Sequence, residues 1–484
     1  MSNTTQSSAR ARIEALLDEN SFVEIGGLIT ARSTDFNMNS KETPSDGVIT
    51  GYGVIDGRLV YVYSQDASVL NGTIGEMHAR KIVKIYDMAV KMGAPVIGLL
   101  DCAGLRLQEA SDALNGFGEI YKAQALASGA VPQISAVFGT CGGGLALVPA
   151  MSDFAYMEEK NAKLFVNSPN ALEGNTAAKC DTASARFQDE NTGLIDGIGD
   201  EASILAEIRQ LVSILPSNCE DGDCYGECMD DLNRLCKDLE NAVADPSIIL
   251  SNISDNNLFI ETKAGYAKDM VTGLIRLNGL TIGAVANRSV VYGEDGQAVE
   301  EFGSVLSAKG CEKAAEFVNF CDAFEIPVLT LTNVTGYKAS KCTEKKIAKA
   351  AASLTYAFAN ATVPKVNVVT GSAFGSAYVT MNSKSIGADY VYAWQDARIG
   401  MMEPQAAVKI MYADEIAASK DAKGLIDEKT AEYNELQSSA LSAAKRGYVD
   451  TIIDAQDTRK YVIGAFEMLF TKREEHPAKK HGTV

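Results

Sequence analysis

Apolar residues recur at helical spacing in the segment ARKIVKIYDMAVKMG, which begins at residue 79. This period places on one face of a helix Ile82, Ile85, Tyr86, Ala89 and Val90. Gly93 suits the left-handed residue that closes such a helix, and Pro95 cannot continue it. Residues 96–100 then form a short, continuous apolar run, which is typical of a strand buried on both faces in an α/β fold.

The same order of helix, proline and strand returns later in GCEKAAEFVNFCDAFEIP and VLTLT. A strand and a glycine turn also recur, after VPQISAV and after VPKVNVV. Four pairs of landmarks are each 232 residues apart, namely Pro95 and Pro327, Gly104 and Gly336, Pro132 and Pro364, and Gly143 and Gly375. A constant offset of this kind indicates a duplicated module, so we expect two α/β domains.

Length and composition agree with two domains in a soluble globular protein, since the chain has 484 residues, of which 46% are hydrophobic and 22% charged. An acidic segment from about residue 216 to 255 is the natural linker between the modules. The net charge of −19 argues against a general nucleic-acid binder. Neither a membrane-spanning run nor an apolar signal core stands out, so we expect a cytoplasmic protein.

The ten cysteines are scattered, which indicates a reducing compartment. Four of them lie closer together in the acidic segment, namely Cys219, Cys224, Cys228 and Cys236. Thiolates at these positions could bind zinc, but the paired spacing of zinc sites is absent. We favour an acidic linker with incidental thiols and predict no metal.

Two glycine-containing turns, DCAG and TCGGG, follow two of the predicted strands of the first module. Because the carboxyl ends of parallel strands meet at one sheet edge, backbone N–H groups of both turns could converge there on one oxygen. Such an oxyanion hole stabilises an enolate or a tetrahedral intermediate. Close packing of helices on strands explains the same glycines, so the residues alone leave both interpretations open.

The small number of histidines limits the catalytic arrangements that are possible, since the sequence contains only His78, His476 and His481. A Ser-His-Asp triad would have to use His78, which stands at the start of a predicted helix, and we interpret this residue as structural. The segment GYGVIDG lacks the lysine of a phosphate-binding loop and is predicted to form a hairpin. A site built on backbone amides needs no histidine.

Taken together, these residues resemble the carboxyltransferase subunits of biotin-dependent acyl-CoA carboxylases and the related decarboxylases. Propionyl-CoA carboxylase β subunits and methylmalonyl-CoA decarboxylase α subunits are familiar members. The resemblance covers nearly the whole chain and is carried by DGVITGYGVIDGR, GTIGEMHARKI, GAPVIGLLDCAGLRLQEA, VPQISAVFGTCGGG, ETKAGYAKDMVTGLIRLNG and ATVPKVNVVTGSAFGSAYVTMNSKSIGADYVYAW. It implies an α/β fold of two tandem crotonase-like domains of the ClpP/crotonase superfamily. We place the N-terminal domain, which the resemblance implies binds acyl-CoA, at residues 1–235. The C-terminal domain, which it implies binds biotin, is placed at residues 236–484.

The resemblance also implies roles for the glycine turns. The amides of Gly143 and Gly144 would hold the thioester oxygen of an acyl-CoA. Those of Gly375, Ser376 and Ala377 would hold the ureido oxygen of biotin, on a neighbouring subunit of a hexamer. The resemblance therefore favours an oxyanion hole as the role of these glycines, with the tight turn as its means.

Contacts with coenzyme A are expected from the DCAGLRL turn, through Ala103 and Gly104, with Arg106 near the phosphates. A guanidinium fork suits phosphate oxygens. A salt bridge from Arg106 to an acid such as Glu109 is an equal alternative.

Biotin is expected on a separate carrier protein, although Lys91 in AVKMG superficially resembles a biotinylation motif. Lys91 lies on the amphipathic helix and is interpreted as a solvated lysine. The other expected partners are a biotin carboxylase or a membrane decarboxylase subunit, and the second of these would bring the chain to a membrane.

This sequence departs from the family near the expected pocket. Ser376 replaces the second of two glycines, Ser372 replaces a lysine, and NVTGYKASKCTEKKIAKAAAS replaces a stretch with proline, histidine and glycines. The simpler interpretation of these changes is neutral sequence drift within a preserved fold. The more specific interpretation is a substrate that carries a different acyl group. Two alternative functions are a non-catalytic ring-forming paralogue and a crotonase-like enzyme that acts on CoA esters without biotin.

Overall fold

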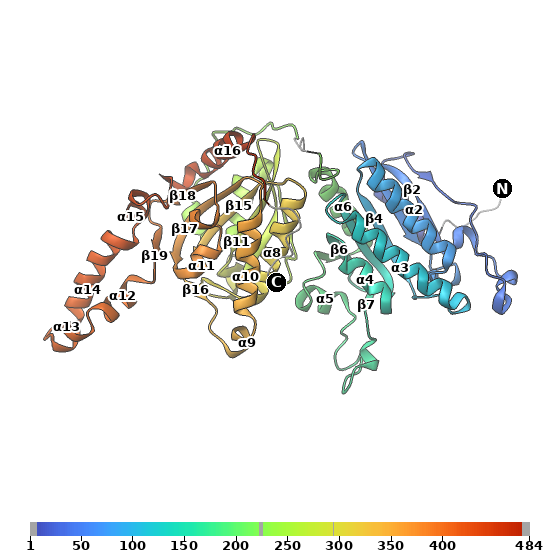
Figure 1. Cartoon of the computed structure of the whole chain (residues 1–484), viewed down its shortest axis with the longest axis horizontal. Helices are drawn as coiled ribbons and strands as arrows, with labels where there is room; N and C mark the ends of the chain where they lie inside the picture. The colour runs from blue at the N-terminus through green and yellow to red at the C-terminus, as the bar shows by residue number, and fades with distance from the viewer. Residues whose placement is uncertain (1–6, 222–225, 294, 477–484) are drawn as a thin grey trace. The chain divides into compact units, whose positions relative to one another are not determined.

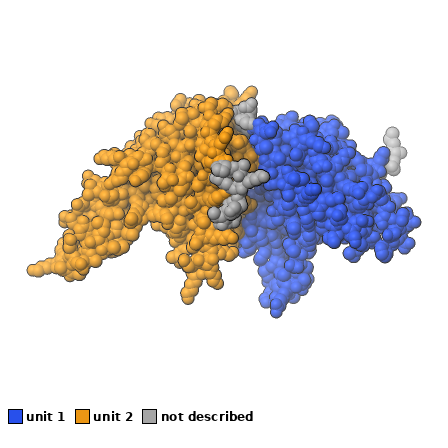
Figure 2. All heavy atoms as spheres, viewed as in Figure 1, with its two compact units in different colours: residues 1–224 blue, residues 225–484 orange. Residues whose placement is uncertain are grey.

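A computed structural model describes residues 7–221, 226–293 and 295–476. The chain forms two compact units, residues 1–224 and residues 225–484 (Figure 2). Each unit is built around a mixed, mainly parallel sheet with helices packed on it (Figure 1). Among the described residues, no helix combines the length and the apolar character needed to cross a membrane.

The sheet of the first unit has the strand order β1-β2-β3-β4-β5-β6-β8, with β7 paired to the end of β5. Strands β2 and β3 form the predicted hairpin, and from β3 to β8 the neighbours are parallel. The strands are β1 (Val23–Glu24), β2 (Val48–Ile55), β3 (Arg58–Gln65), β4 (Val96–Cys102), β5 (Gln133–Gly142), β6 (Phe154–Glu158), β7 (Lys163–Phe165) and β8 (Gly197–Gly199).

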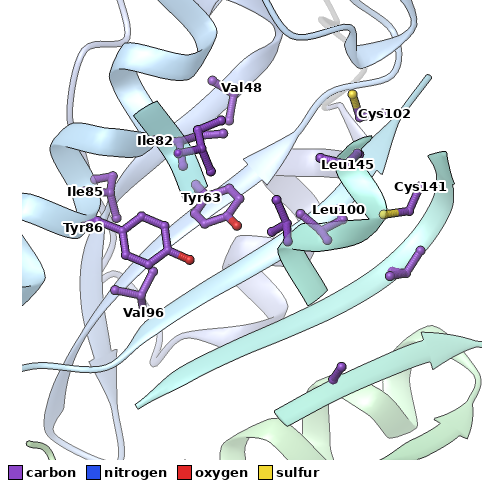
Figure 3. Close-up of a cluster of buried hydrophobic side chains, with 14 of the residues drawn as sticks. Val48, Tyr63, Ile82, Ile85, Tyr86, Val96, Leu100, Cys102, Cys141 and Leu145 are labelled. Atoms are coloured by element: carbon purple, nitrogen blue, oxygen red, sulfur yellow. The ribbon is translucent and has the colours of Figure 1, made fainter. Parts of the chain in front are cut away.

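Helix α2 shows how the sequence pattern positions these elements. Its residues Ile82, Ile85, Tyr86 and Ala89 are buried in the core that Figure 3 shows, whereas Val90 is 40% exposed, so its predicted place on the buried face is wrong. Gly93 closes the helix with φ of 61°, as predicted. The helices of this unit are α1 (Ser8–Leu16), α2 (Glu76–Met92), α3 (Ala110–Ala127), α4 (Leu147–Ala150), α5 (Ala185–Asn191) and α6 (Glu201–Ile214).

The sheet of the second unit repeats this topology, with the order β9-β10-β11-β15-β17-β18-β20 and β19 paired to the end of β17. Strands β15 and β17 begin and end 232 residues after β4 and β5, which confirms the duplication. The strands are β9 (Phe259–Thr262), β10 (Met270–Leu277), β11 (Leu280–Asn287), β15 (Val328–Val334), β17 (Lys365–Phe374), β18 (Tyr390–Trp394), β19 (Arg398–Gly400) and β20 (Thr451–Ile453).

Shorter strands and helices complete the second unit. Helices α12, α13 and α14 project from its body (Figure 1). The short strands are β12 (Val290–Tyr292), β13 (Ala298–Glu301), β14 (Val305–Leu306) and β16 (Gly336–Tyr337). The helices are α7 (Pro246–Ile253), α8 (Ala308–Ala323), α9 (Lys341–Glu344), α10 (Ile347–Asn360), α11 (Gly375–Thr380), α12 (Pro404–Met411), α13 (Ala413–Ala418), α14 (Ala422–Tyr433), α15 (Ala440–Lys445) and α16 (Thr458–Leu469).

The predicted linker from about residue 216 to 255 is wrong over its second part. Leu239, Ile249 and Ile253 are buried in the core of the second unit, because α7 packs its apolar face there despite the acidic surroundings. The compact units divide at residues 224 and 225, whereas the sequence placed the boundary after residue 235.

The cysteines of this segment do not share one environment. The backbone N–H of Cys219 donates to Ala130 O in the first unit, whereas Cys236 is buried in the second unit. Cys228 is half-buried, and Cys224 lies outside the described residues. Within the described residues, no cluster of three or more His, Cys, Asp or Glu side chains could hold a metal ion.

Candidate functional site

The first glycine turn lies where strand β5 ends and a helical turn, residues 143–146, begins. Gly143 has φ of +64°, and a Cβ atom placed there would meet no atom within 4 Å. The first N–H groups of a helical turn have no partner inside the turn. The Cβ side of Gly143 therefore borders open space, which leaves room for a ligand beside the start of this helical turn.

Gly144 is enclosed instead by the aromatic side chains of α3. The Tyr121 hydroxyl donates to Gly144 O at 2.6 Å, and a Cβ at Gly144 would lie 2.8 Å from the Tyr121 oxygen and 3.1 Å from the Phe117 ring. Tyr121 and Phe117 stack with their ring centres 5.7 Å apart, and burial raises the pKa of the Tyr121 hydroxyl. Close packing thus requires a glycine at 144, whatever the turn binds.

The turn after β4 leaves the sheet beside the first glycine turn, because Cys102 pairs with Cys141 in the parallel register. Gly104 has φ of +108° and open space where a Cβ would lie. The N–H of Ala103 donates to Asn71 O at 3.1 Å, so this amide is already bonded. The two turns therefore leave neighbouring strands at the same sheet edge, but the N–H of Ala103 is not free to donate to an oxygen shared with the first glycine turn.

Arg106 lies beneath this turn rather than in its open face, since it is only 1% exposed. Its Nη1 donates to Asp46 Oδ1 at 2.6 Å and to Glu109 Oε1 at 2.7 Å, and its Nη2 donates to Thr73 O at 2.9 Å. The expected contact with CoA phosphates is therefore not available to this guanidinium, and the salt-bridge alternative describes the structure.

The two carboxylates that hold Arg106 also cap helix α2. Glu109 accepts from the N–H of Glu76 at 2.7 Å, and Asp46 accepts from the N–H of His78 at 2.8 Å. Burial raises the pKa of Asp46, and the charge of Arg106 opposes that rise. Arg106 therefore balances two buried carboxylates and fixes the turn onto the start of α2.

His78 is fully buried in the same cluster, as its structural interpretation predicted. Its Nε2 lies 3.2 Å from Gln65 Nε2, and its Nδ1 lies 2.9 Å from Asp46 O. Burial, followed by the charge of Arg106, lowers the pKa of His78 to about 3. The imidazole is neutral at physiological pH and has no access to a substrate.

The second glycine turn begins helix α11 at Gly375, whose φ of +64° equals that of Gly143. A Cβ at Gly375 would meet only Met401 O, at 3.3 Å. The Ser376 side chain is exposed, whereas that of Ala377 is buried. The second turn thus shares with the first the φ of its leading glycine, although it begins an α-helix rather than a 3-10 turn.

Asn333, and its counterpart Asp101 in the DCAG turn, were given no role by the sequence patterns, yet each lies against a glycine of the strand that leads to a glycine turn. Asn333 Oδ1 accepts from Ser372 N at 2.9 Å, and a Cβ at Gly371 would lie 2.6 Å from that oxygen. In the first unit, a Cβ at Gly139 would overlap the carboxylate of Asp101. The 232-residue offset was the signal that could have found this pair.

The offset also relates two buried lysines, Lys81 on α2 and Lys313 on α8. Lys81 Nζ donates to Ser45 O at 2.8 Å, and Lys313 Nζ donates to Lys263 O at 2.8 Å and to Tyr266 O at 3.0 Å. Burial lowers the pKa of each lysine to about 8. Lys81 thus links α2 to the segment that precedes the β2–β3 hairpin, and Lys313 links α8 to the segment that precedes the β10–β11 hairpin.

Comparison with known proteins agrees with this geometry. Residues 3–484 match the family model of the carboxyl transferase domain, so the chain belongs to the carboxyl transferase family. It is a carboxyltransferase subunit of the class that includes propionyl-CoA carboxylase β chains and methylmalonyl-CoA decarboxylase α subunits. The expected crotonase-like α/β fold and the resemblance stated from the sequence are both confirmed.

The similarity to individual members extends over most of both chains. The methylmalonyl-CoA decarboxylase subunit alpha of Propionigenium modestum is 39% identical, over 98% of this chain and 92% of that protein. The propionyl-CoA carboxylase beta chain of Roseobacter denitrificans is also 39% identical, over 98% and 93%. The transcarboxylase 12S structure, a hexamer assembly with hydrolysed methylmalonyl-coenzyme A bound, superimposes with a TM-score of 0.91 at 35% identity, over 99% of this chain and 92% of that one.

Proposed function

We propose that the chain moves a carboxyl group between biotin, carried on a separate protein, and a short acyl-CoA of the malonyl, methylmalonyl or propionyl type. The observation that carries the proposal is the open backbone at Gly143 in a chain of the carboxyl transferase family. The relatives named for propionyl-CoA and methylmalonyl-CoA support the substrate class. Biotin, when bound, supplies the carrier from which the carboxyl group leaves or to which it returns.

The first turn would bind the acyl group. The N–H groups of Gly143 and Gly144 would donate to the thioester oxygen as negative charge develops on it, which is the largest stabilising effect that such a site offers. Ala103 and Gly104 of the neighbouring turn would contact the CoA moiety, since Gly104 leaves open space on its Cβ side.

The second turn would bind biotin. Its open side at Gly375 leaves room for a ligand oxygen, and the N–H groups of Gly375, Ser376 and Ala377 lie in the first turn of α11, where they have no acceptor within the helix. Donation from these amides would polarise the ureido oxygen. No side-chain acid or base is needed for this role, in agreement with a buried, neutral His78.

A panel of assays on the purified chain tests this function. The chain is incubated with free biotin and malonyl-, methylmalonyl- or propionyl-type CoA thioesters, and carboxyl transfer is followed in both directions. We expect turnover that depends on biotin. Turnover without biotin would point to a crotonase-like CoA-ester enzyme, and none at all would point to a ring-forming paralogue.

We also propose that the site is shared between subunits of a hexamer, by analogy with the hexamer assembly of transcarboxylase 12S. Exposed apolar side chains that such an assembly would cover include Leu107, Leu114, Leu126, Met401, Ile410 and Met411. The buried area would have to outweigh the repulsion from a net charge of −19.

Mixed subunits test the shared site. Gly143→Val, at a position where a Cβ atom meets nothing within 4 Å, and Ser376→Val are each expected to abolish turnover. A mixture with verified subunit exchange should regain activity, because one site of a mixed pair combines two intact turns. An inactive mixture would refute the shared geometry. The genes that neighbour this one then distinguish the two complexes, since a biotin carboxylase accompanies synthesis and a membrane subunit accompanies decarboxylation.

A further inference from the structure

A concentration of positive charge lies in a segment that the proposed function does not use. Residues 338–349 carry five exposed lysines and one glutamate, in a chain whose net charge is −19. We call these lysines the lysine patch: Lys338, Lys341, Lys345, Lys346 and Lys349. Among the described residues, no salt bridge joins any of the five to a carboxylate.

The segment that carries the lysine patch is anchored on both sides to α11, the helix that the second glycine turn begins. The hydroxyl of Tyr337 in β16 lies 2.9 Å from Thr380 Oγ1 in α11, the helix that begins at Gly375. Thr355 in α10 donates to the same Thr380 oxygen at 3.2 Å. Figure 1 shows α9 next to β16 and α10 in the same part of the second unit.

The surface at the patch has only a shallow, widely open depression. An open pocket of about 460 Å³ is lined by Ala339, Ser340, Lys341, Glu344 and Lys345. Like charges that stand this close in sequence repel one another, and Glu344 is the only carboxylate within residues 338–349. The excess of positive charge in this segment therefore suits an anionic partner.

We propose that the lysine patch docks an acidic surface of the protein that carries biotin. This inference rests on the proposed function of the Gly375 turn, because the carrier must approach that turn. An acidic carrier would be repelled by the chain as a whole, and a local positive surface both attracts it and sets its orientation. The unusual sequence of residues 338–349 then has a role in partner recognition.

Two probe peptides of equal length test the proposal. Both contain one biotinylated lysine, flanked in one by aspartates and in the other by asparagines. At low salt we expect the wild type to use the aspartate peptide with a kcat/KM about 10-fold higher. The variant Lys341→Gln/Lys345→Gln/Lys346→Gln should lower that ratio to about one, as should about 0.5 M salt.

A matched control removes the same charge elsewhere. Lys84→Gln/Lys91→Gln/Lys122→Gln changes three exposed lysines of the first unit and should keep the ratio of the wild type. Fluorescence anisotropy with labelled peptides that lack biotin measures docking without turnover. Failure of carboxyl transfer would therefore refute the proposed function while the binding data still decide on docking.

Two outcomes would overturn the docking proposal. Equal binding of the aspartate peptide by the wild type and the patch variant would show that the lysines do not recognise it. A weaker affinity of the patch variant for the CoA thioester, measured without any peptide, would assign the lysines to the phosphates of coenzyme A instead.

Discussion

Asp101 and Asn333 occupy the same position in the two modules, and each lies against a glycine of the neighbouring strand. At both places the strand pairing shifts. Leu100 pairs with Val137 but Cys102 with Cys141, and β15 and β17 shift in the same way between Thr332 and Val334. The longer strand therefore bulges opposite Asp101 or Asn333, and a bulge redirects the end of the strand that leads to the glycine turn.

We expect Gly371→Ala to destabilise the second unit and to abolish carboxyl transfer. A Cβ at this position would lie 2.6 Å from Asn333 Oδ1, so the bulge must shift. Overpacking of this kind costs about 1–3 kcal/mol. Chemical denaturation measures the loss of stability, and steady-state kinetics measures the loss of turnover.

The double variant Gly371→Ala/Asn333→Ala is the control for that prediction. Truncation of Asn333 makes room for the methyl group but removes the hydrogen bond to Ser372 N. The double variant should therefore lose less free energy of unfolding than the two single variants lose when their losses are added. Additive losses would contradict a direct contact between the two residues.

We expect Gly143→Ala to lower kcat by about 100-fold, because its methyl group would occupy the open space where the thioester oxygen is proposed to bind. The matched control is Gly57→Ala in the hairpin turn, with φ of +78° and equally open space. Each change places an L-residue in the left-handed region, which costs about 1–2 kcal/mol. Equal turnover in the two variants would refute the role of Gly143.

We expect Arg106→Met to lower the free energy of unfolding by about 3–5 kcal/mol, since it leaves the buried Asp46 and Glu109 without a cation. Arg106→Lys keeps a charge and should lose less. The affinity ratio of Arg106→Lys for an acyl-CoA and its 3′-dephospho analogue, measured by calorimetry, should equal that of the wild type. A changed affinity ratio would support the contact between Arg106 and the CoA phosphates that the sequence suggested.

We expect His78 to make the protein sensitive to acid. The unfolded imidazole takes up a proton below pH 6.5, whereas the folded one does so only below about 3. The unfolded state therefore binds more protons between these two pH values. The contribution of His78 to the free energy of unfolding is complete above pH 6.5 and is lost as pH falls from 6.5 toward 3. When the pH is lowered from 7 to 5, the free energy of unfolding of His78→Gln should fall by about 2 kcal/mol less than that of the wild type.

Urea unfolding at both pH values measures that difference. Parallel losses in the His78→Gln variant and the wild type would show that the buried imidazole does not titrate as stated.

Much of the fold could be predicted because its signals are local or repeated. The period of Ile82, Ile85 and Tyr86 identified α2, and the constant offset of glycines and prolines identified the duplication. Val90 was misplaced because the buried face of α2 is narrower than its apolar stripe. The core helix α7 was hidden in an acidic segment, where composition outweighed its short apolar pattern.

The site was predictable only in part, since its supports come from distant segments. Arg106 meets Asp46 across 60 residues, and no spacing rule connects an arginine of one turn with an aspartate before a hairpin. The glycine turns carry a strong local signal, yet the reason for Gly144 is the packing of Phe117 and Tyr121 from another helix. Contacts of this kind depend on the finished fold.

The equal φ of Gly143 and Gly375 has an evolutionary consequence. Together with the 232-residue offset, it indicates that the ancestral module already possessed this turn, so both copies began with the same backbone conformation at the leading glycine. The residue after the glycine now differs between the two copies. Gly144 lies under the aromatic rings of α3, whereas its counterpart Ser376 is exposed.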